Sequence, residues 1–435
     1  MMRRLLPGAR SGLLLEYAAM LCVLASVAWV VTFYLSRHHL PQPFIFDISD
    51  TFMDWFNTAF WANRTGAYPV WHTVYPPLSF VFLDIFSIDR CYVEPFAARD
   101  CDWVGKATIL FFYALSSTLA IFAFWRTDRA TALPRGLSFA FGFPLLFCLE
   151  RGNLILVCLV PFIVAYGNIA VRPFWRWLSI AVTINFKPYL IMPSLALGVK
   201  REWRALEMTG FLTIAVYLVT LMLFGSGDPL SIYENTGMWV AFNSGQFWQQ
   251  SYFSTSYATF LMIKDSTFPI LTFVDSDVVE TAAWVIPVLI AATQITAISA
   301  IVAGWLQPQS VSLQRMAALF AGVHLVMQSP GGYALTFLIF LVFLEPGRRL
   351  GQAIALACCY ALSLSCDWIL ATVVDVDLFS WLSGQAVPAN FGLSVGQLVR
   401  PGLVILIVWS LALDTIAQVV KAHRGSRPTL GLASA

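Results

Sequence analysis

The chain has 435 residues, of which 59% are hydrophobic and 11% are charged, and its formal net charge is +2. A soluble domain carries about 25% charged residues, so this composition excludes a conventional water-exposed surface, and the small net charge argues against nucleic-acid binding. The apolar residues form long runs rather than one-sided stripes, which indicates helices that are apolar all round. We expect an all-α, polytopic integral membrane protein that forms a single domain over residues 1–435.

The first apolar run, residues 13–35, follows several arginines and is too long for the core of a signal peptide. We interpret it as an uncleaved anchor whose N-terminal side is cytoplasmic, because basic residues favour that side of a membrane. The same rule then predicts about twelve crossings with both termini inside, since each basic loop falls on the cytoplasmic side. The predicted crossings are 12–34, 106–125, 137–150, 154–170, 176–187, 188–199, 207–224, 283–305, 314–328, 332–345, 351–373 and 400–420.

The first outer loop, residues 36–105, is too long for a simple connector. Within it, residues 52–62 predict an amphipathic helix, on which Asp54 and Asn57 share a face with the preceding Asp50. The loop is therefore expected to hold carboxylates over the membrane. Aromatic side chains of the same helix are expected at the membrane interface, where such rings are favoured. They are Trp55, Phe56, Phe60 and Trp61.

The rest of this loop contains a short apolar segment and a pair of cysteines. Residues 77–88 are too short to span comfortably, so we interpret them as an interfacial helix, with a tilted crossing as the alternative. Cys91 and Cys101 lie in a polar stretch, and on the oxidising side of the membrane we expect them to form a disulfide. The other cysteines lie in apolar segments and are interpreted as small core residues. They are Cys22, Cys148, Cys158, Cys358, Cys359 and Cys366.

Three pairs of predicted crossings turn over within a few residues, at polar tips. Their short arms reach only about 16 to 22 Å, against a hydrocarbon core of about 30 Å. Irregular backbone and charge at that depth need a polar cavity, so we expect the tips to line a recessed, outward-facing cleft. The residues expected at its floor are Glu150, Arg151, Asn153, Lys187 and His324.

The charges of this cleft favour an anionic ligand. Lys187 adds a second cation to Arg151 without an adjacent acid, so a phosphate would complete the site. The alternative is that Glu150 and Arg151 pair with each other or with neighbours, while Pro and Gly make the turns. A carboxylate at the mouth of the cleft, from Asp50 or Asp54, suits a general base that acts on a hydroxyl. Helix capping and a solvated face are the alternative roles for these two residues.

The second outer loop, residues 225–282, carries aromatic and amide side chains over residues 243–257. These suit sugar binding through stacking and hydrogen bonds, and they equally suit an interfacial helix. The sequence shows no metal-ligand spacing of His, Cys, Asp or Glu. We therefore expect neither a metal nor another cofactor.

Four motifs follow one another along the chain: the acidic stretch 50–57, Tyr75-Pro76-Pro77-Leu78, Glu150-Arg151-Gly152-Asn153, and Lys187-Pro188-Tyr189 before a basic turn at 200–204. The segments Asn243-Ser244 and Ser329-Pro330 with Tyr333 extend the series. Together they resemble glycosyltransferase family 87, the polyprenyl-phosphate-mannose-dependent mannosyltransferases of the GT-C superfamily. The resemblance covers about residues 45–345 and implies a GT-C-like fold.

The resemblance also implies an activity: inverting transfer of a hexose, with mannose as the expected sugar, from a polyprenyl-monophosphate donor to a hydroxyl of a lipid or glycan acceptor on the outer face. Asp50 matches the loop aspartate that acts as general base, and Asp54 is the second candidate. Arg151 and Lys187 would face the carrier phosphate. The further residues expected to bind donor or acceptor are Tyr75, His72, Asn153, Glu150, Tyr189 and His324.

Other functions share some of these features. A membrane polysaccharide polymerase or ligase with lipid-diphosphate donors also needs large outer loops and cations, and a non-catalytic membrane subunit is a third possibility. A lipid or solute transporter usually has two repeated halves and a site near the bilayer midplane, whereas this chain shows no internal repeat. We expect a bacterial inner or plasma membrane, a site that faces the periplasm or exterior, membrane lipids as further partners and no nucleic acid.

Overall fold

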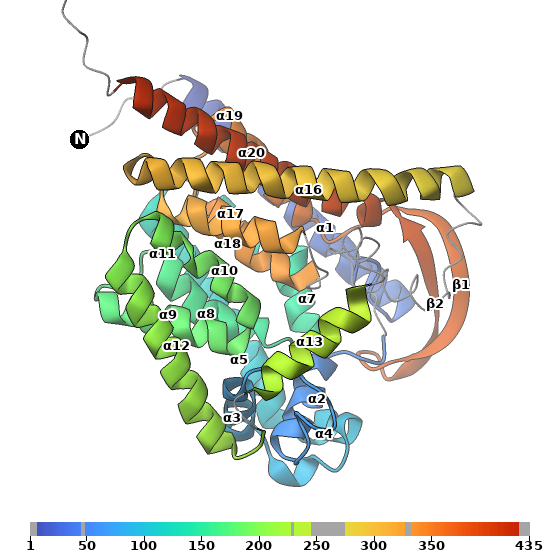
Figure 1. The fold of residues 1–435 in the computed structure, drawn as a ribbon. Helices are drawn as coiled ribbons and strands as arrows, with labels where there is room; N and C mark the ends of the chain where they lie inside the picture. The colour runs from blue at the N-terminus through green and yellow to red at the C-terminus, as the bar shows by residue number, and fades with distance from the viewer. Residues whose placement is uncertain (1–6, 45–47, 228–229, 245–274, 327–331, 426–435) are drawn as a thin grey trace, which may run out of the picture.

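The computed structural model of the chain is mostly helical, and its helices form one elongated bundle (Figure 1). Several helices expose large apolar side chains on their outer surface, as expected for a protein embedded in lipid. On α12 (Trp203–Phe224), for example, Phe211, Ile214 and Met222 are all exposed. The structure describes residues 7–44, 48–227, 230–244, 275–326 and 332–425.

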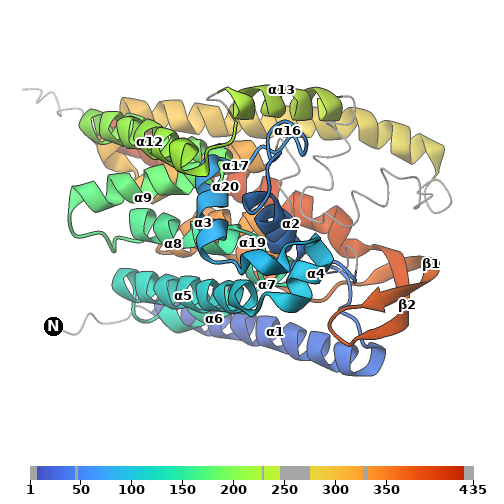
Figure 2. The ribbon, with the colours of Figure 1, turned by 90° about the horizontal axis from the view of Figure 1, so that it is seen from below.

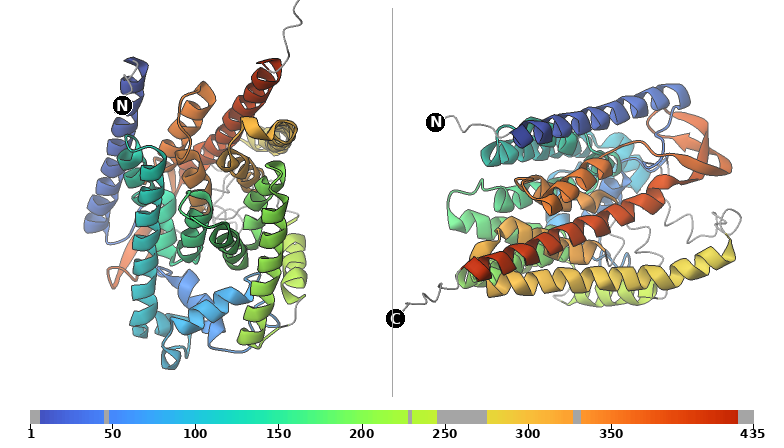
Figure 3. Two further views of the ribbon diagram at one scale, coloured as in Figure 1. Left: turned by 90° about the vertical axis from the view of Figure 1, so that its left-hand side faces the viewer. Right: turned by 90° about the horizontal axis from the view of Figure 1, so that it is seen from above.

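Six helical stretches in the described part of the chain are long and apolar enough to cross a membrane. The protein is therefore membrane-embedded, as predicted. Figure 3 shows that α1 begins and α20 ends at the same end of the bundle. The six stretches are provided by α1 (Pro7–Arg37), α5 (Trp103–Thr127), α6 (Ala132–Ala140) with α7 (Phe143–Arg151), α12, α16 (Ser276–Leu306) and α20 (Val395–Gly425).

The other predicted crossings correspond to shorter helices, several of which are largely buried within the bundle. α18 is buried along its whole length, which explains its uniformly apolar sequence. The longest of these helices has 14 residues and reaches only about 21 Å, so the count of about twelve crossings stays a prediction. These helices are α8 (Ile155–Tyr166), α9 (Pro173–Phe186), α10 (Ile191–Ser194), α11 (Ala196–Val199), α17 (Leu313–Leu325), α18 (Leu335–Phe343) and α19 (Leu350–Leu362).

Residues 53–101 form a layer of short helices beside the start of α5 (Figure 2). The disulfide between Cys91 and Cys101 is formed, as predicted. α3 has only nine residues and packs against α2, α9 and α12, which supports the interpretation that it does not cross the membrane. The elements of the layer are α2 (Met53–Ala62), α3 (Pro77–Ile85), the 3₁₀ turn Asp89–Cys91 and α4 (Pro95–Cys101).

The predicted interfacial position of the aromatic residues on α2 is wrong for two of the four. Trp55 and Phe56 are completely buried, while Phe60 and Trp61 are partly buried. The reason is that α3 and α4 cover the apolar face of α2, so that Leu83 joins the same core. The loop therefore builds a packed layer rather than a helix that rests on lipid.

The prediction of a crossing at 351–373 is wrong in its second half, although the chain is mostly helical with little sheet, in line with the expected fold class. α19 ends at Leu362, and an antiparallel hairpin follows, with β1 (Ile369–Ser380) paired to β2 (Gln385–Ser394). In the sequence, a run of β-branched residues and the alternation of Val with Asp375 and Asp377 favour a strand over a membrane helix. The hairpin turn uses a left-handed glycine, Gly384, with a φ of 69°.

Candidate functional site

Two carboxylates from the segment between α1 and α5 contact one arginine at the end of α7. The Arg151 Nη2 atom lies 2.6 Å from Asp50 Oδ2 and 2.8 Å from Asp54 Oδ1. The Arg151 side chain is 4% exposed, whereas the Asp50 and Asp54 side chains are 17% and 21% exposed. Arg151 is thus a buried ion-pair partner of two carboxylates that stay partly accessible. We call Asp50, Asp54, Arg151 and Asn153 the aspartate cluster.

Asn153 completes the aspartate cluster from the start of α8. Its Oδ1 atom accepts a hydrogen bond from the backbone N–H of Ile155 at 3.0 Å, which fixes the orientation of the amide. Its Nδ2 atom therefore faces Asp54 and donates a hydrogen bond to Asp54 Oδ2 at 2.7 Å. Both carboxylate oxygens of Asp54 thus accept a hydrogen bond, one from Arg151 and one from Asn153.

The tight turn after α7 brings these residues together. Gly152 adopts a left-handed conformation with a φ of 61°, and a Cβ atom there would lie 3.1 Å from the Cα and O atoms of Phe52. Phe52 is itself left-handed, with a φ of 64°, and its backbone N–H donates to the Glu150 carbonyl at 2.8 Å. Residues 49–54 are called the aspartate loop below. Glycine at position 152 therefore allows this loop to lie directly on the end of α7.

Glu150 anchors the loop rather than pairing with Arg151. Its Oε1 atom accepts a hydrogen bond from the Thr51 hydroxyl at 3.1 Å, while Oε2 is buried without a hydrogen-bond partner among the described residues. The alternative that these charges pair with neighbours is thus correct for Arg151. The prediction that the Arg151 guanidinium faces the carrier phosphate is not supported, because it is buried against Asp50 and Asp54.

The sequence did not single out Arg99, whose side chain forms hydrogen bonds to the backbone of the aspartate loop. The side chain is 4% exposed, and its Nη1 atom donates to the backbone oxygens of Ser49 and Thr51. Its guanidinium also lies 4.8 Å from the ring centre of Trp381, in the hairpin turn. The position of Arg99 within the loop closed by Cys91 and Cys101 was the available signal.

The same layer is tied to α5 by a buried pair. Asp102 is fully buried and accepts hydrogen bonds from the Tyr92 hydroxyl at 2.7 Å and from the backbone N–H of Gly105 at 3.0 Å. Burial, together with the hydrogen bond to this carboxylate, raises the pKa of Tyr92 well above its ordinary value. Tyr92 therefore stays protonated and keeps the disulfide-closed loop attached to the start of α5.

Lys187 follows directly on α9 and is 9% exposed. Its Nζ atom donates to the Tyr75 hydroxyl at 3.1 Å and lies 4.3 Å from the centre of the Tyr75 ring. The charges of Asp54 and Lys187 both act on the thiol of Cys148, on α7. Across the described ranges, no carboxylate forms an ion pair with Lys187.

The other predicted residues divide into two groups. Tyr189 stacks on His324, with ring centres 4.9 Å apart and planes 11° from parallel, and Tyr189 OH and His324 Nε2 find no hydrogen-bond partner in the part of the chain described. His72 is exposed, with a φ of 52°, and no hydrogen bond or ion pair joins it to the cluster within that part. The structure therefore gives no support to its predicted role.

Part of the predicted site lies outside the described residues. This applies to Ser329-Pro330 and to residues 245–257 of the aromatic and amide segment, and the side chains of Asn243 and Ser244 are likewise not described. Among the described residues, no group of three or more His, Cys, Asp or Glu side chains is placed to hold a metal ion.

Similarity to other proteins gives no independent guide to this site. No protein-family model, no curated protein and no solved structure matches the chain.

Proposed function

We propose that this protein transfers a hexose, with mannose as the expected sugar, from a polyprenyl-monophosphate carrier to a hydroxyl of a lipid or glycan acceptor. One observation carries the proposal. Lys187 is a buried cation without an ion-pair partner among the described residues, and its charge and that of the partly exposed Asp54 both act on Cys148. A buried charge is costly unless it is paired, so an anionic substrate is the partner that this arrangement requires.

The number of charges favours a monophosphate donor over a diphosphate. Arg151 already faces Asp50 and Asp54, which leaves Lys187 as the cation of this neighbourhood for the donor. A sugar linked to a lipid through one phosphate carries a single negative charge, and Lys187 balances it. A diphosphate would carry two, which is why the polymerase or ligase with lipid-diphosphate donors is the second candidate.

We propose the following reaction for these residues. We assign Asp50 as the general base, which takes the proton of the acceptor hydroxyl as its oxygen forms a bond to the anomeric carbon. The bond from that carbon to the phosphate oxygen breaks, and the electron pair leaves with the phosphate, whose charge Lys187 stabilises. Attack from the face opposite the phosphate inverts the anomeric configuration.

The two aspartates differ in the role that we assign to them. Both carboxylate oxygens of Asp54 accept hydrogen bonds from Arg151 and Asn153, so Asp54 is suited to positioning the arginine and the loop. Asp50 matches the loop aspartate of the glycosyltransferases that the sequence resembles. It shares the Nη2 atom of Arg151 with Asp54 and is 17% exposed.

A panel of donors tests the proposal. The purified protein is reconstituted in liposomes with radiolabelled mannose on polyprenyl monophosphate, with glucose on the same carrier, and with a sugar on polyprenyl diphosphate. We expect transfer from a monophosphate donor and a product of inverted anomeric configuration by NMR. Transfer from the diphosphate alone supports the polymerase or ligase reading, and movement of intact lipid or sugar without transfer supports a transporter.

A further inference from the structure

A polar pocket lies at the other end of the bundle from the aspartate cluster. α5 begins beside α2, where Gly105 faces the Trp55 and Phe56 side chains, and it ends at Thr127 on the wall of this pocket. The 25 residues between these ends cover about 37 Å. The pocket therefore lies at the far ends of candidate membrane spans, on the side where α1 begins and α20 ends (Figure 3).

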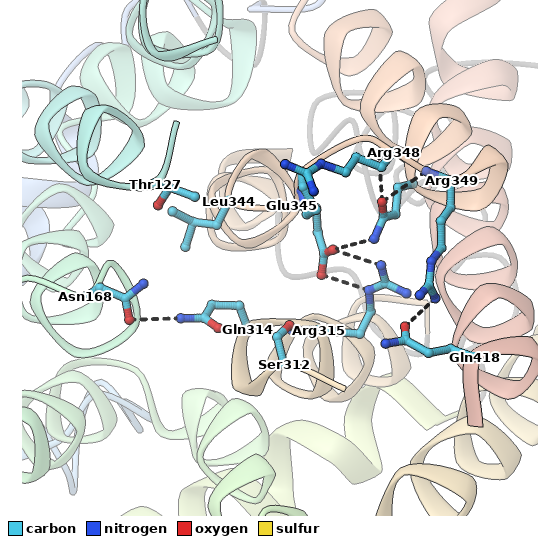
Figure 4. A pocket seen from close by; sticks show the side chains of 12 residues that line it. Thr127, Asn168, Ser312, Gln314, Arg315, Leu344, Glu345, Arg348, Arg349 and Gln418 are labelled. Atoms are coloured by element: carbon cyan, nitrogen blue, oxygen red, sulfur yellow. Dashed lines mark hydrogen bonds and ion pairs between the residues drawn. The ribbon is translucent and has the colours of Figure 1, made fainter. Parts of the chain in front are cut away.

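The pocket has a volume of about 420 Å³, which falls within the range of about 300 to 1,000 Å³ typical of small-molecule sites. Figure 4 shows Arg348 and Arg349 on one side, with Thr127 and Asn168 on the other. The floor carries Arg315 and Glu345. Amide and hydroxyl groups thus face two arginines across an open space.

The acids near the pocket are already neutralised. Glu345 accepts two hydrogen bonds of 2.8 Å from Arg315, through Nε and Nη2, and a third from Gln352 at 3.1 Å. Asp414 accepts from Arg315 Nη1 at 3.0 Å and lies 3.7 Å from Arg349 Nη1. Three arginines therefore meet two carboxylates here, which leaves one positive charge in excess.

Arg348 supplies that excess charge. Its guanidinium forms no ion pair within the described ranges. The Oε1 atom of Gln352 accepts from the backbone N–H groups of Arg348 and Arg349 at 2.9 and 3.2 Å, which fixes the backbone that carries both arginines. Two neighbouring guanidinium groups on a fixed backbone are suited to an oxyanion such as phosphate.

We infer that this pocket binds a phosphate group, with Arg348 as its principal contact and Arg349 as the second. The headgroup of an anionic phospholipid is the expected source, because the pocket lies at the ends of membrane spans and such headgroups collect there. A soluble phosphate compound offers the same chemistry, and the experiment below separates the two sources. The inference concerns a second site and does not depend on sugar transfer.

Arg348→Gln is the decisive variant, since it removes the charge without stranding a described carboxylate. Arg129→Gln is the matched control, because Arg129 lies in the turn after α5 but does not line the pocket. Each protein is placed in nanodiscs of phosphatidylcholine with a minor fraction of phosphatidylglycerol, and the lipids retained after release are counted by native mass spectrometry. A second arm measures thermal unfolding in detergent with added inorganic phosphate.

We expect wild type and Arg129→Gln to retain phosphatidylglycerol, and Arg348→Gln to bind it about tenfold more weakly, as for loss of one charge-assisted hydrogen bond. Stabilisation of wild type but not of Arg348→Gln by inorganic phosphate, without lipid retention, supports the pocket with a soluble ligand. Equal retention by all three proteins together with no response to phosphate overturns the inference, and so does an equal loss in Arg129→Gln.

Discussion

Two arginines in this chain each hold two carboxylates, one at each end of the bundle, and they hold them differently. In the aspartate cluster a single atom, Arg151 Nη2, contacts both Asp50 and Asp54. Near the other end, Arg315 uses Nε and Nη2 for Glu345 and Nη1 for Asp414. One nitrogen of Arg151 thus contacts both of its carboxylates, whereas Arg315 reaches Glu345 and Asp414 through different nitrogens.

Exposure follows the same division. The carboxylates held by Arg315 are 6% and 10% exposed, whereas those held by Arg151 are 17% and 21% exposed. The buried ion pairs of Arg315 are suited to holding helices together, and we call Arg315, Glu345 and Asp414 the buried triad. The partly exposed carboxylates beside Arg151 remain accessible to a ligand. The number of charges alone therefore does not separate a structural ion pair from a candidate site, whereas the exposure of the carboxylates does.

The largest expected effect on stability is at Arg315, Glu345 and Asp414. Arg315→Met leaves Glu345 and Asp414 buried without their main partner, so we expect the free energy of unfolding to fall by about 3 to 5 kcal/mol. Arg151→Met is the matched change at the aspartate cluster, where more exposed acids should reduce the loss. Denaturation of both variants in detergent, followed by circular dichroism, measures the difference. Equal losses in the two variants would show that the exposure of the carboxylates does not set the cost of losing the arginine.

Lys187→Met tests whether the charge beside the aspartates serves a ligand. We expect sugar transfer to fall about 100-fold, as for loss of one group that stabilises developing charge, with unfolding nearly unchanged because a buried charge is removed rather than stranded. Transfer assays and thermal unfolding check the two halves of this expectation. Lys106→Met, which removes a lysine outside the site, is the control. A large loss of stability with normal transfer would make Lys187 a structural residue.

A smaller effect is expected from the disulfide. Cys91→Ser with Cys101→Ser opens a loop whose ends are ten residues apart, which should lower the free energy of unfolding by about 2 to 3 kcal/mol. Because Arg99 lies within this loop and supports Ser49 and Thr51, transfer should fall as well. The paired serine variant, compared with oxidised wild type, gives both quantities. Unchanged transfer would show that the aspartate loop does not depend on this support.

The sequence was sufficient for the features that depend on local pattern. Apolar runs identified the membrane helices, and the polar tips together with the acidic loop identified Asp50, Asp54, Arg151 and Asn153. It was insufficient for contacts between distant segments. Asp50 and Arg151 are 101 residues apart in the chain, and nothing in their local sequence shows that they pair. The hairpin of β1 and β2 was missed because its first residues continue an apolar run.

If Asp50 is the general base and Asp54 its support, amide substitutions at the two positions will have different effects on transfer. In liposomes with radiolabelled polyprenyl-phosphate mannose, Asp50→Asn is predicted to lower the rate of transfer about 10²- to 10⁴-fold, the usual contribution of a general base. Asp54→Asn is predicted to lower it less, and Asp84→Asn, which changes an exposed acid on α3, not at all. Near-normal transfer by a folded Asp50→Asn protein would show that Asp50 is not the general base.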